Sequence, residues 1–280
     1  MNKTAVSALL AIPSIAAASM YLTPTHKVVH ADYMLVDEAL VIIPVDNAEY
    51  ADAAANLYLE RSGFDAAPDF SNVSTLDMPE VVSGGGLDNA VNYGVNELVQ
   101  AVEQQYDAGN GDISAADPLY IFGYSQSSVV MGMAEQQLYD YGIPSQDLNF
   151  VMVGDSASAE GGFLNTFLDS LPESWQQDVI DAFNQFRAGD VLGATTPDNL
   201  YPTEVYSLSG DGWANYDNGL NDLGMYSDHL EYLGLTSQEI ASAGAPVVDG
   251  ITDYFTIQDS MVNSLEALWT QLQIADSVLF

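Results

Sequence analysis

The chain has 280 residues, no cysteine, and 40 acidic against four basic side chains, giving a formal net charge of −36 at pH 7. Such an acidic surface is a poor partner for nucleic acid or anionic lipid, and the absence of lysine beyond residue 27 excludes Schiff-base and P-loop chemistry. The acids are scattered and form no cluster with histidine, so we expect a solvated surface, no metal site and no cofactor. A domain of this length can be stable without disulfides.

The N-terminal residues carry the features of an export signal. Lys3 supplies a positive charge, residues 5–22 are mostly apolar, and Val29-His30-Ala31 matches a small-x-Ala cleavage pattern. We therefore expect residues 1–31 to be a signal peptide and the protein to be secreted or located in the cell envelope. An uncleaved membrane anchor is the alternative, because an apolar stretch of ~18 residues is borderline for spanning a bilayer.

Residues 32–280 are expected to form a single α/β domain, because short β-branched runs alternate with segments of helical periodicity. In chain order, we expect a strand over 39–43, a helix over 48–59, a long irregular connection over 61–86, a helix over 87–106, a strand over 119–122, a helix over 125–141, and strands over 149–153 and 204–208. This alternation predicts a mostly parallel central sheet with helices on both faces.

Two later segments are rich in large apolar residues. The aromatic side chains of residues 156–200 either line an acyl-chain pocket, form a lid or pack as ordinary helices; they are Phe163, Phe167, Trp175, Phe183 and Phe186. The last segment has apolar residues at helical spacing, which we expect to pack on the sheet rather than contact a membrane; they are Met261, Leu265, Leu268, Trp269 and Leu272.

The segment Gly123-Tyr124-Ser125-Gln126-Ser127 directly follows the strand expected over 119–122. A nucleophilic serine on a tight strand-to-helix turn needs small neighbours, which Gly123 and Ser127 provide. We predict that Ser125 is a nucleophile and that the backbone N–H of Gln126 binds an oxyanion at the helix N-terminus. The alternative is a serine that only caps the helix.

A serine nucleophile needs a base, and His229 is the only histidine beyond residue 30. In α/β-hydrolases the order along the chain is serine, acid, histidine. Asp211 follows the strand expected over 204–208 and is the predicted acid. Asp217 and Asp228 remain alternatives.

These residues resemble the PE-PPE domain hydrolases of mycobacteria, which are serine esterases with a cutinase-like α/β-hydrolase core. The resemblance covers roughly residues 39–235. The segments that carry it are Ala39-Leu40-Val41 followed by Tyr50-Ala51-Asp52-Ala53 and Leu57-Tyr58, the helix that ends near Gln104-Gln105, the Phe122–Ser127 turn, Gly161-Gly162-Phe163-Leu164, and the acid segment Gly210-Asp211-Gly212-Trp213-Ala214.

Two segments depart from the family pattern. The family has a glycine-rich loop after its first strand that helps to form the oxyanion hole, whereas this chain has Pro44-Val45-Asp46-Asn47. Proline has no N–H to donate, so Val45 is the predicted second backbone donor. Residues 155–158 also replace a loop that contains Asn-Pro in the family. Both departures bear on catalytic efficiency rather than on the reaction class.

The resemblance and the residues together predict an exported serine esterase that hydrolyses small-molecule or lipid esters of carboxylic acids. Ser125 would form an acyl-enzyme, His229 would transfer protons and Asp211 would orient the imidazole. Association with the cell envelope and the oligomeric state are left open. One alternative is an acyltransferase that acylates a sugar hydroxyl. Another is a non-catalytic envelope protein with a relic of the serine turn, which the altered loop at 44–47 favours.

Overall fold

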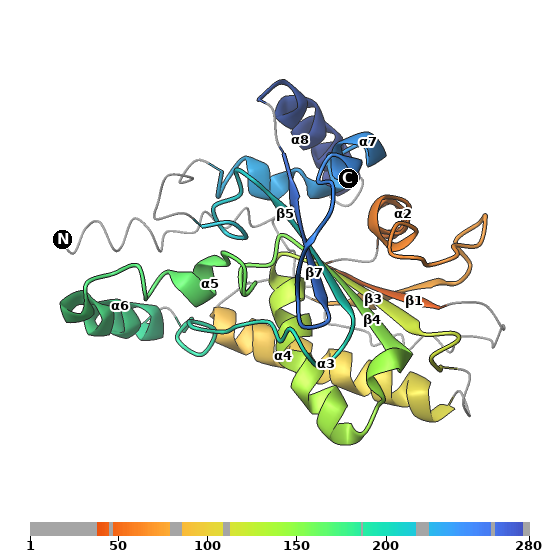
Figure 1. Cartoon of the computed structure of the whole chain (residues 1–280), viewed down its shortest axis with the longest axis horizontal. Coiled ribbons are helices and arrows are strands. Elements are labelled where there is room, and N and C mark those ends of the chain that lie inside the picture. The colour runs from red at the N-terminus through yellow and green to blue at the C-terminus, as the bar shows by residue number, and fades with distance from the viewer. Residues whose placement is uncertain are drawn as a thin grey trace.

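The computed structural model describes residues 38–44, 47–78, 86–108, 113–185, 187–216, 224–258 and 261–276 (Figure 1). The strands are β1 (Ala39–Ile43), β2 (Val73–Asp77), β3 (Leu119–Tyr124), β4 (Leu148–Val153), β5 (Thr203–Leu208), β6 (Val247–Asp249) and β7 (Thr252–Ile257). In the described ranges they form one seven-stranded sheet in the order β2-β1-β3-β4-β5-β7-β6. Every neighbouring pair is parallel except β6–β7.

Helices cover both sides of this sheet. They are α2 (Ala48–Ala54), which continues as a π-helical turn η1 (Ala55–Leu59), α3 (Leu87–Ala108), α4 (Gln126–Tyr141), α5 (Phe163–Thr166), α6 (Glu173–Gln185), α7 (Ser237–Ala241) and α8 (Met261–Asp276), with short 3₁₀ turns η2 (Ser145–Asp147), η3 (Asp228–Leu230) and η4 (Tyr232–Gly234). Figure 1 shows α3 and α4 on one side of the sheet and α2, α7 and α8 on the other. The predicted α/β class with a mostly parallel sheet is therefore confirmed.

The central strands are apolar throughout because both of their faces are covered. In β1, Leu40 and Ile42 belong to the core beneath α3 and α4, whereas Val41 and Ile43 belong to the core beneath α2. All of these side chains are at most 2% exposed. A strand buried on both sides reads as a continuous apolar run, which is why β1, β3 and β4 can be predicted from the sequence.

The prediction of an irregular connection over residues 61–86 is wrong, because residues 73–77 form β2. This edge strand pairs on one side only, and its residues Val-Ser-Thr-Leu-Asp are half-buried or exposed, so they lack the apolar run of the inner strands. The hairpin of β6 and β7 was also not predicted. Its outer strand is three exposed residues long, and the turn at Gly250 has a positive φ of 58°.

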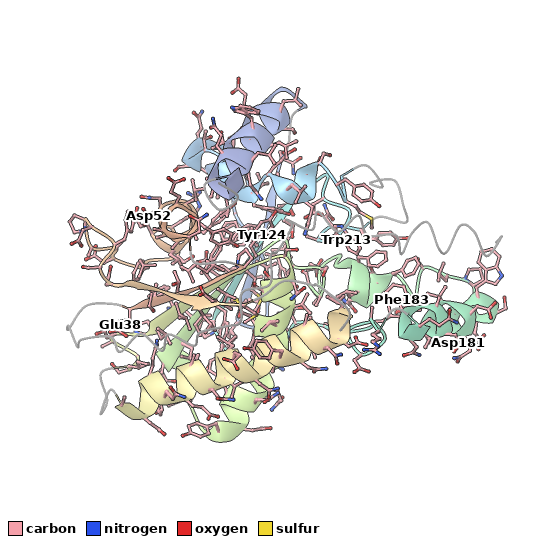
Figure 2. The ribbon with its side chains drawn as sticks, turned by 180° about the vertical axis from the view of Figure 1, so that it is seen from behind. Glu38, Asp52, Tyr124, Asp181, Phe183 and Trp213 are labelled. Carbon is pink, nitrogen blue, oxygen red and sulfur yellow. The ribbon has the colours of Figure 1, made fainter. Side chains whose placement is uncertain are left out.

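The aromatic residues of the α5–α6 region pack against one another. The ring of Phe163 stacks on Phe167 at a centroid distance of 4.6 Å and meets Trp213 edge-on at 5.0 Å. Phe183 is buried in the same core (Figure 2), whereas Trp175 is exposed. For these buried rings the structure shows ordinary helical packing. Phe186 lies outside the described residues.

The prediction that the last helix packs on the sheet through its large apolar residues is wrong for three of them. Leu265, Trp269 and Leu272 on α8 are 70%, 64% and 48% exposed. The opposite side of α8, with Ala267 buried, packs on η4. Within the described ranges, no helix has both the length and the apolarity needed to cross a bilayer.

Candidate active site

Ser125 occupies the sharp turn between β3 and α4. Its φ of 59° and ψ of −120° lie in a region that side-chain-bearing residues rarely adopt, which is the strained geometry of a nucleophile turn. The turn requires a glycine two residues earlier, since a Cβ on Gly123 would lie 2.9 Å from the carbonyl carbon of Ser127. The hydroxyl of Ser125 makes no capping bond to α4, so the capping alternative has no support in this geometry.

The turn is tied to the neighbouring strand β4. The N–H of Ser125 donates to the carbonyl oxygen of Val153 at 2.9 Å. The hydroxyl of Ser128, which is completely buried, lies 2.8 Å from the carbonyl oxygen of Gly123 and donates to it. Because these bonds join β3, α4 and β4, the strained turn is held in place by the buried part of the sheet.

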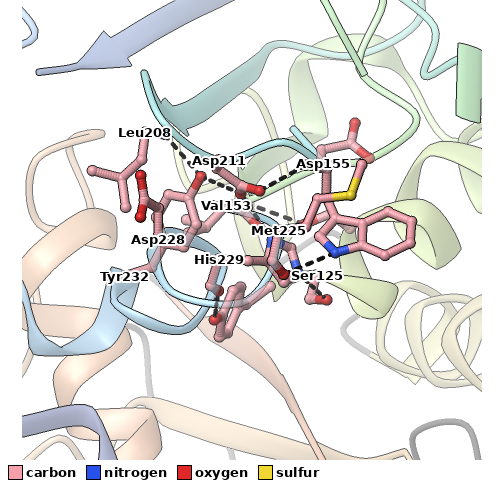
Figure 3. A network of polar contacts seen from close by, with 12 residues as sticks. Ser125, Val153, Asp155, Leu208, Asp211, Met225, Asp228, His229 and Tyr232 are labelled. Atoms are coloured by element: carbon pink, nitrogen blue, oxygen red, sulfur yellow. Dashed lines mark hydrogen bonds and ion pairs between the residues drawn. The ribbon is translucent and has the colours of Figure 1, made fainter. Parts of the chain in front are cut away.

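The structure brings Ser125, His229 and Asp211 together at the carboxyl edge of the sheet (Figure 3). The hydroxyl oxygen of Ser125 is 2.7 Å from Nε2 of His229, and Nδ1 of His229 is 2.8 Å from Oδ2 of Asp211. Asp211 follows β5 through a two-residue turn. The alternative acid Asp228 accepts from the hydroxyl of Ser227 at 2.6 Å. The other alternative, Asp217, lies outside the described residues.

The carboxylate of Asp211 is fully buried and accepts three hydrogen bonds. Besides His229, the hydroxyl of Tyr232 donates to Oδ2 at 2.8 Å and the N–H of Trp213 donates to Oδ1 at 2.8 Å. Burial, with the charge of Asp211 adding to it, raises the pKa of Tyr232 well above its usual range, so this hydroxyl stays protonated and is a donor. A buried carboxylate needs such donors in place of water.

The segment that carries His229 is fixed from two directions. Its N–H donates to the carbonyl oxygen of Gly224 at 3.0 Å, and the hydroxyl of Tyr124, which precedes the serine, donates to its carbonyl oxygen. Gln271 on α8 donates to the Tyr124 hydroxyl at 3.1 Å and accepts from the N–H of Leu233 at 3.0 Å. The C-terminal helix is thereby connected to the serine turn and to the histidine segment.

The sequence does not mark Tyr232 or Gln271 as residues of the site. Tyr232 lies three residues after His229 and Gln271 lies 42 residues after it. Neither belongs to a motif, and only the fold reveals their contacts. Tyr124 belongs to the serine motif, but the motif does not predict its bond to the histidine segment.

Of the two predicted oxyanion donors, the structure describes only Gln126. Gln126 is the first residue of α4, so its N–H lies at the positive end of a 16-residue helix, where a developing negative charge is stabilised. Val45 lies outside the described residues. Among the residues that the structure describes, no group of three or more acidic or histidine side chains could hold a metal ion.

Asp155 and Glu135 also carry buried carboxyl groups. Asp155 follows β4 and accepts from the hydroxyl of Thr196 at 2.6 Å and from the N–H of Ala157 at 2.9 Å. Burial raises its pKa to about 6. Glu135 on α4 has no hydrogen-bond partner for either oxygen within the described structure, and burial, followed by the charge of Asp155, raises its pKa well above the usual range.

Sequence relatives are found in Mycobacterium tuberculosis (strain ATCC 25618 / H37Rv). The uncharacterized PPE family protein PPE28 is 28% identical over 242 residues, which are 80% of this chain and 33% of that protein. The esterase PE16 is 32% identical over 167 residues, which are 55% of this chain and 28% of that protein. The chain thus spans about a third or less of the length of these relatives.

Solved structures with a similar arrangement include the type II thioesterase BorB of the borrelidin biosynthetic cluster and an esterase from Pyrobaculum calidifontis. BorB is 13% identical, with 93% of this chain and 92% of that chain covered and a TM-score of 0.39. The esterase is 14% identical, with 87% and 77% covered and a TM-score of 0.40. The sequence profile of the PE-PPE domain matches residues 70–260, which is more than half of the chain. The chain belongs to the PE-PPE domain family.

Proposed function

We propose that this protein is a serine esterase that hydrolyses carboxylic esters. The observation that carries the proposal is the hydrogen-bonded series in which Ser125 Oγ lies 2.7 Å from His229 Nε2 and His229 Nδ1 lies 2.8 Å from Asp211 Oδ2. The serine stands on a strained turn at a helix N-terminus, the position that nucleophiles of α/β-hydrolases occupy. The sequence similarity to the esterase PE16 supports the same reaction class.

The distances suit proton transfer at both nitrogen atoms of His229. Nε2 takes the proton of Ser125 as its oxygen attacks the ester carbonyl, and the buried Asp211 carboxylate stabilises the imidazolium that forms. The carbonyl oxygen becomes negatively charged and accepts a hydrogen bond from the N–H of Gln126, with Val45 as the second predicted donor. The imidazolium then protonates the departing alcohol, which leaves an acyl group on Ser125.

Water completes the reaction. His229 takes a proton from a water molecule as the water oxygen attacks the acyl carbon. The imidazolium then returns this proton to the Ser125 oxygen as the carboxylic acid leaves. An acyltransferase would use the same groups and differ only in the acceptor. The hydration expected of a surface dominated by carboxylates favours water as that acceptor.

We propose further that the protein is exported, since residues 1–31 have the composition of a cleavable signal peptide. These residues lie outside the described structure. N-terminal sequencing of exported protein is expected to begin at or near Asp32, and material that begins at Met1 would contradict cleavage.

The catalytic proposal is tested with a short p-nitrophenyl ester in water that contains millimolar trehalose or glucose, with the products resolved by mass spectrometry. We expect free acid as the main product, and its formation lost in Ser125→Ala. Ser242→Ala, which removes an exposed hydroxyl far along the chain, serves as the control and should retain activity. Acylated sugar in excess of free acid would favour the acyltransferase. A folded wild-type protein with no turnover of any ester would favour the non-catalytic alternative.

A further inference from the structure

We propose that Tyr232 is a positioning residue of the reaction, which holds the Asp211 carboxylate in its orientation toward His229. This inference rests on the proposed esterase function. The hydroxyl of Tyr232 shares Oδ2 of Asp211 with Nδ1 of His229, at 2.8 Å in each case (Figure 3). Tyr232 and His229 are therefore linked through a single oxygen atom of Asp211. Tyr232 itself contacts neither the serine nor a substrate bound there.

The direction of the Tyr232 hydrogen bond is fixed by a second contact. The N–H of Leu208, at the end of β5, donates to the Tyr232 oxygen at 2.8 Å. A backbone N–H can only donate, so the hydroxyl proton of Tyr232 is directed to the carboxylate of Asp211. The same tyrosine thus links the end of the strand that precedes the acid to the acid itself.

The hydrogen bond from Tyr232 is important for Asp211 because water does not reach this carboxylate. Tyr232 and Asp211 are both 0% exposed, so no solvent replaces a lost donor. A donor to the charged form of a carboxylate stabilises that form and weakens its attraction for a further proton. The other titratable groups around Tyr232 are Tyr58, which donates to its carbonyl oxygen at 2.8 Å, Tyr124, whose ring lies 5.5 Å away, and the adjacent buried Glu231.

Tyr232→Phe removes only the hydroxyl and should move the pH profile of activity. Without this donor, the negative charge of the buried Asp211 carboxylate is less well stabilised. We expect the acid limb of kcat/KM to shift upward by about half a pH unit to one unit. At the optimum kcat should fall about tenfold, the loss typical of one hydrogen bond to a charged group, while KM stays near the wild-type value.

Tyr58→Phe is the matched control. It removes an equally buried tyrosine hydroxyl, and the bond that it deletes ends on the carbonyl oxygen of Tyr232 itself. A merely structural role for residue 232 would be expected to give both variants the same pH profile. We expect Tyr58→Phe to lower thermal stability and to leave the position of the acid limb unchanged.

Two further measurements keep the test decisive. In an Asp211→Asn background, Tyr232→Phe should cause no further loss of kcat, because the tyrosine acts through the acid. Replacement of Tyr232 by 3-fluorotyrosine preserves the ring and makes the hydroxyl a stronger donor, so the acid limb should move to lower pH. An unshifted acid limb in both Tyr232→Phe and the fluorotyrosine protein, with the wild type active, would overturn this inference. Inactivity of the wild type would instead count against the esterase itself.

Discussion

At the scale of single residues, hydrogen bonds and burial hold the side chains of the site in fixed positions. Ser125 is held at a φ of 59° by bonds to the neighbouring strand, and Asp211 is surrounded by three donors with no exposed surface. The sequence predicts the serine and the histidine as candidates, because a motif marks the serine and the scarcity of histidine marks the base. Their partner Tyr232 could not, because nothing in the sequence sets it apart among 16 tyrosines.

The assignment of the acid is tested by comparing three variants. Asp211→Asn should lower kcat by on the order of 10⁴, because an amide at this position favours the wrong tautomer of the imidazole. Asp228→Asn and Asp217→Asn replace the other two candidate acids and should change kcat by less than about tenfold. Steady-state kinetics on one ester measures all three, and a loss at Asp217 or Asp228 that matches or exceeds the loss at Asp211 would move the assignment.

At the scale of elements, predictability from the sequence follows burial. Strands β1, β3 and β4 are covered on both faces, and their apolar runs predict them within one or two residues. The edge strand β2 is half-exposed, so its sequence carries no such run. Long-range contacts are invisible to local patterns, which explains why the role of α8 beside the histidine segment could not be predicted.

The contact from α8 predicts that Gln271 supports activity from a distance. Gln271→Leu removes its bonds to Tyr124 and Leu233, so the segment that carries His229 should become less well fixed. We expect a several-fold loss of kcat and a lower Tm. Gln273→Leu, an exposed position two residues along the same helix, is the control for added apolar surface. Equal effects of the two substitutions on kcat would show that the contacts of Gln271 do not matter for the reaction.

At the scale of the whole molecule, most acidic side chains are solvated but a few are buried in the core. The net charge of −36 is mostly carried by solvated acids, yet Glu135 and Asp155 are enclosed in the core, where ionisation is costly. Both have a folded-state pKa above the unfolded value. The folded protein therefore binds more protons between those values, and stability falls as pH rises through that window, which for Asp155 runs from 3.8 to about 6.

Glu135→Gln should accordingly stabilise the protein at high pH. The substitution removes the buried charge and deletes no hydrogen bond seen in the described structure. We expect a Tm that is near the wild-type value at pH 4 and a few degrees higher at pH 8. Glu266→Gln removes one exposed charge and controls for the change in net charge. The expectation fails if the two variants respond to pH in the same way.

The central claim, that Ser125 is the nucleophile of an active site, is tested most directly by covalent labelling. A fluorophosphonate reacts with a serine only where a base and an oxyanion site activate it. We expect one phosphonyl adduct on the folded wild-type protein, located by peptide mass spectrometry at Ser125 and absent from His229→Ala. No adduct on the folded protein, or an adduct at another serine, would contradict it.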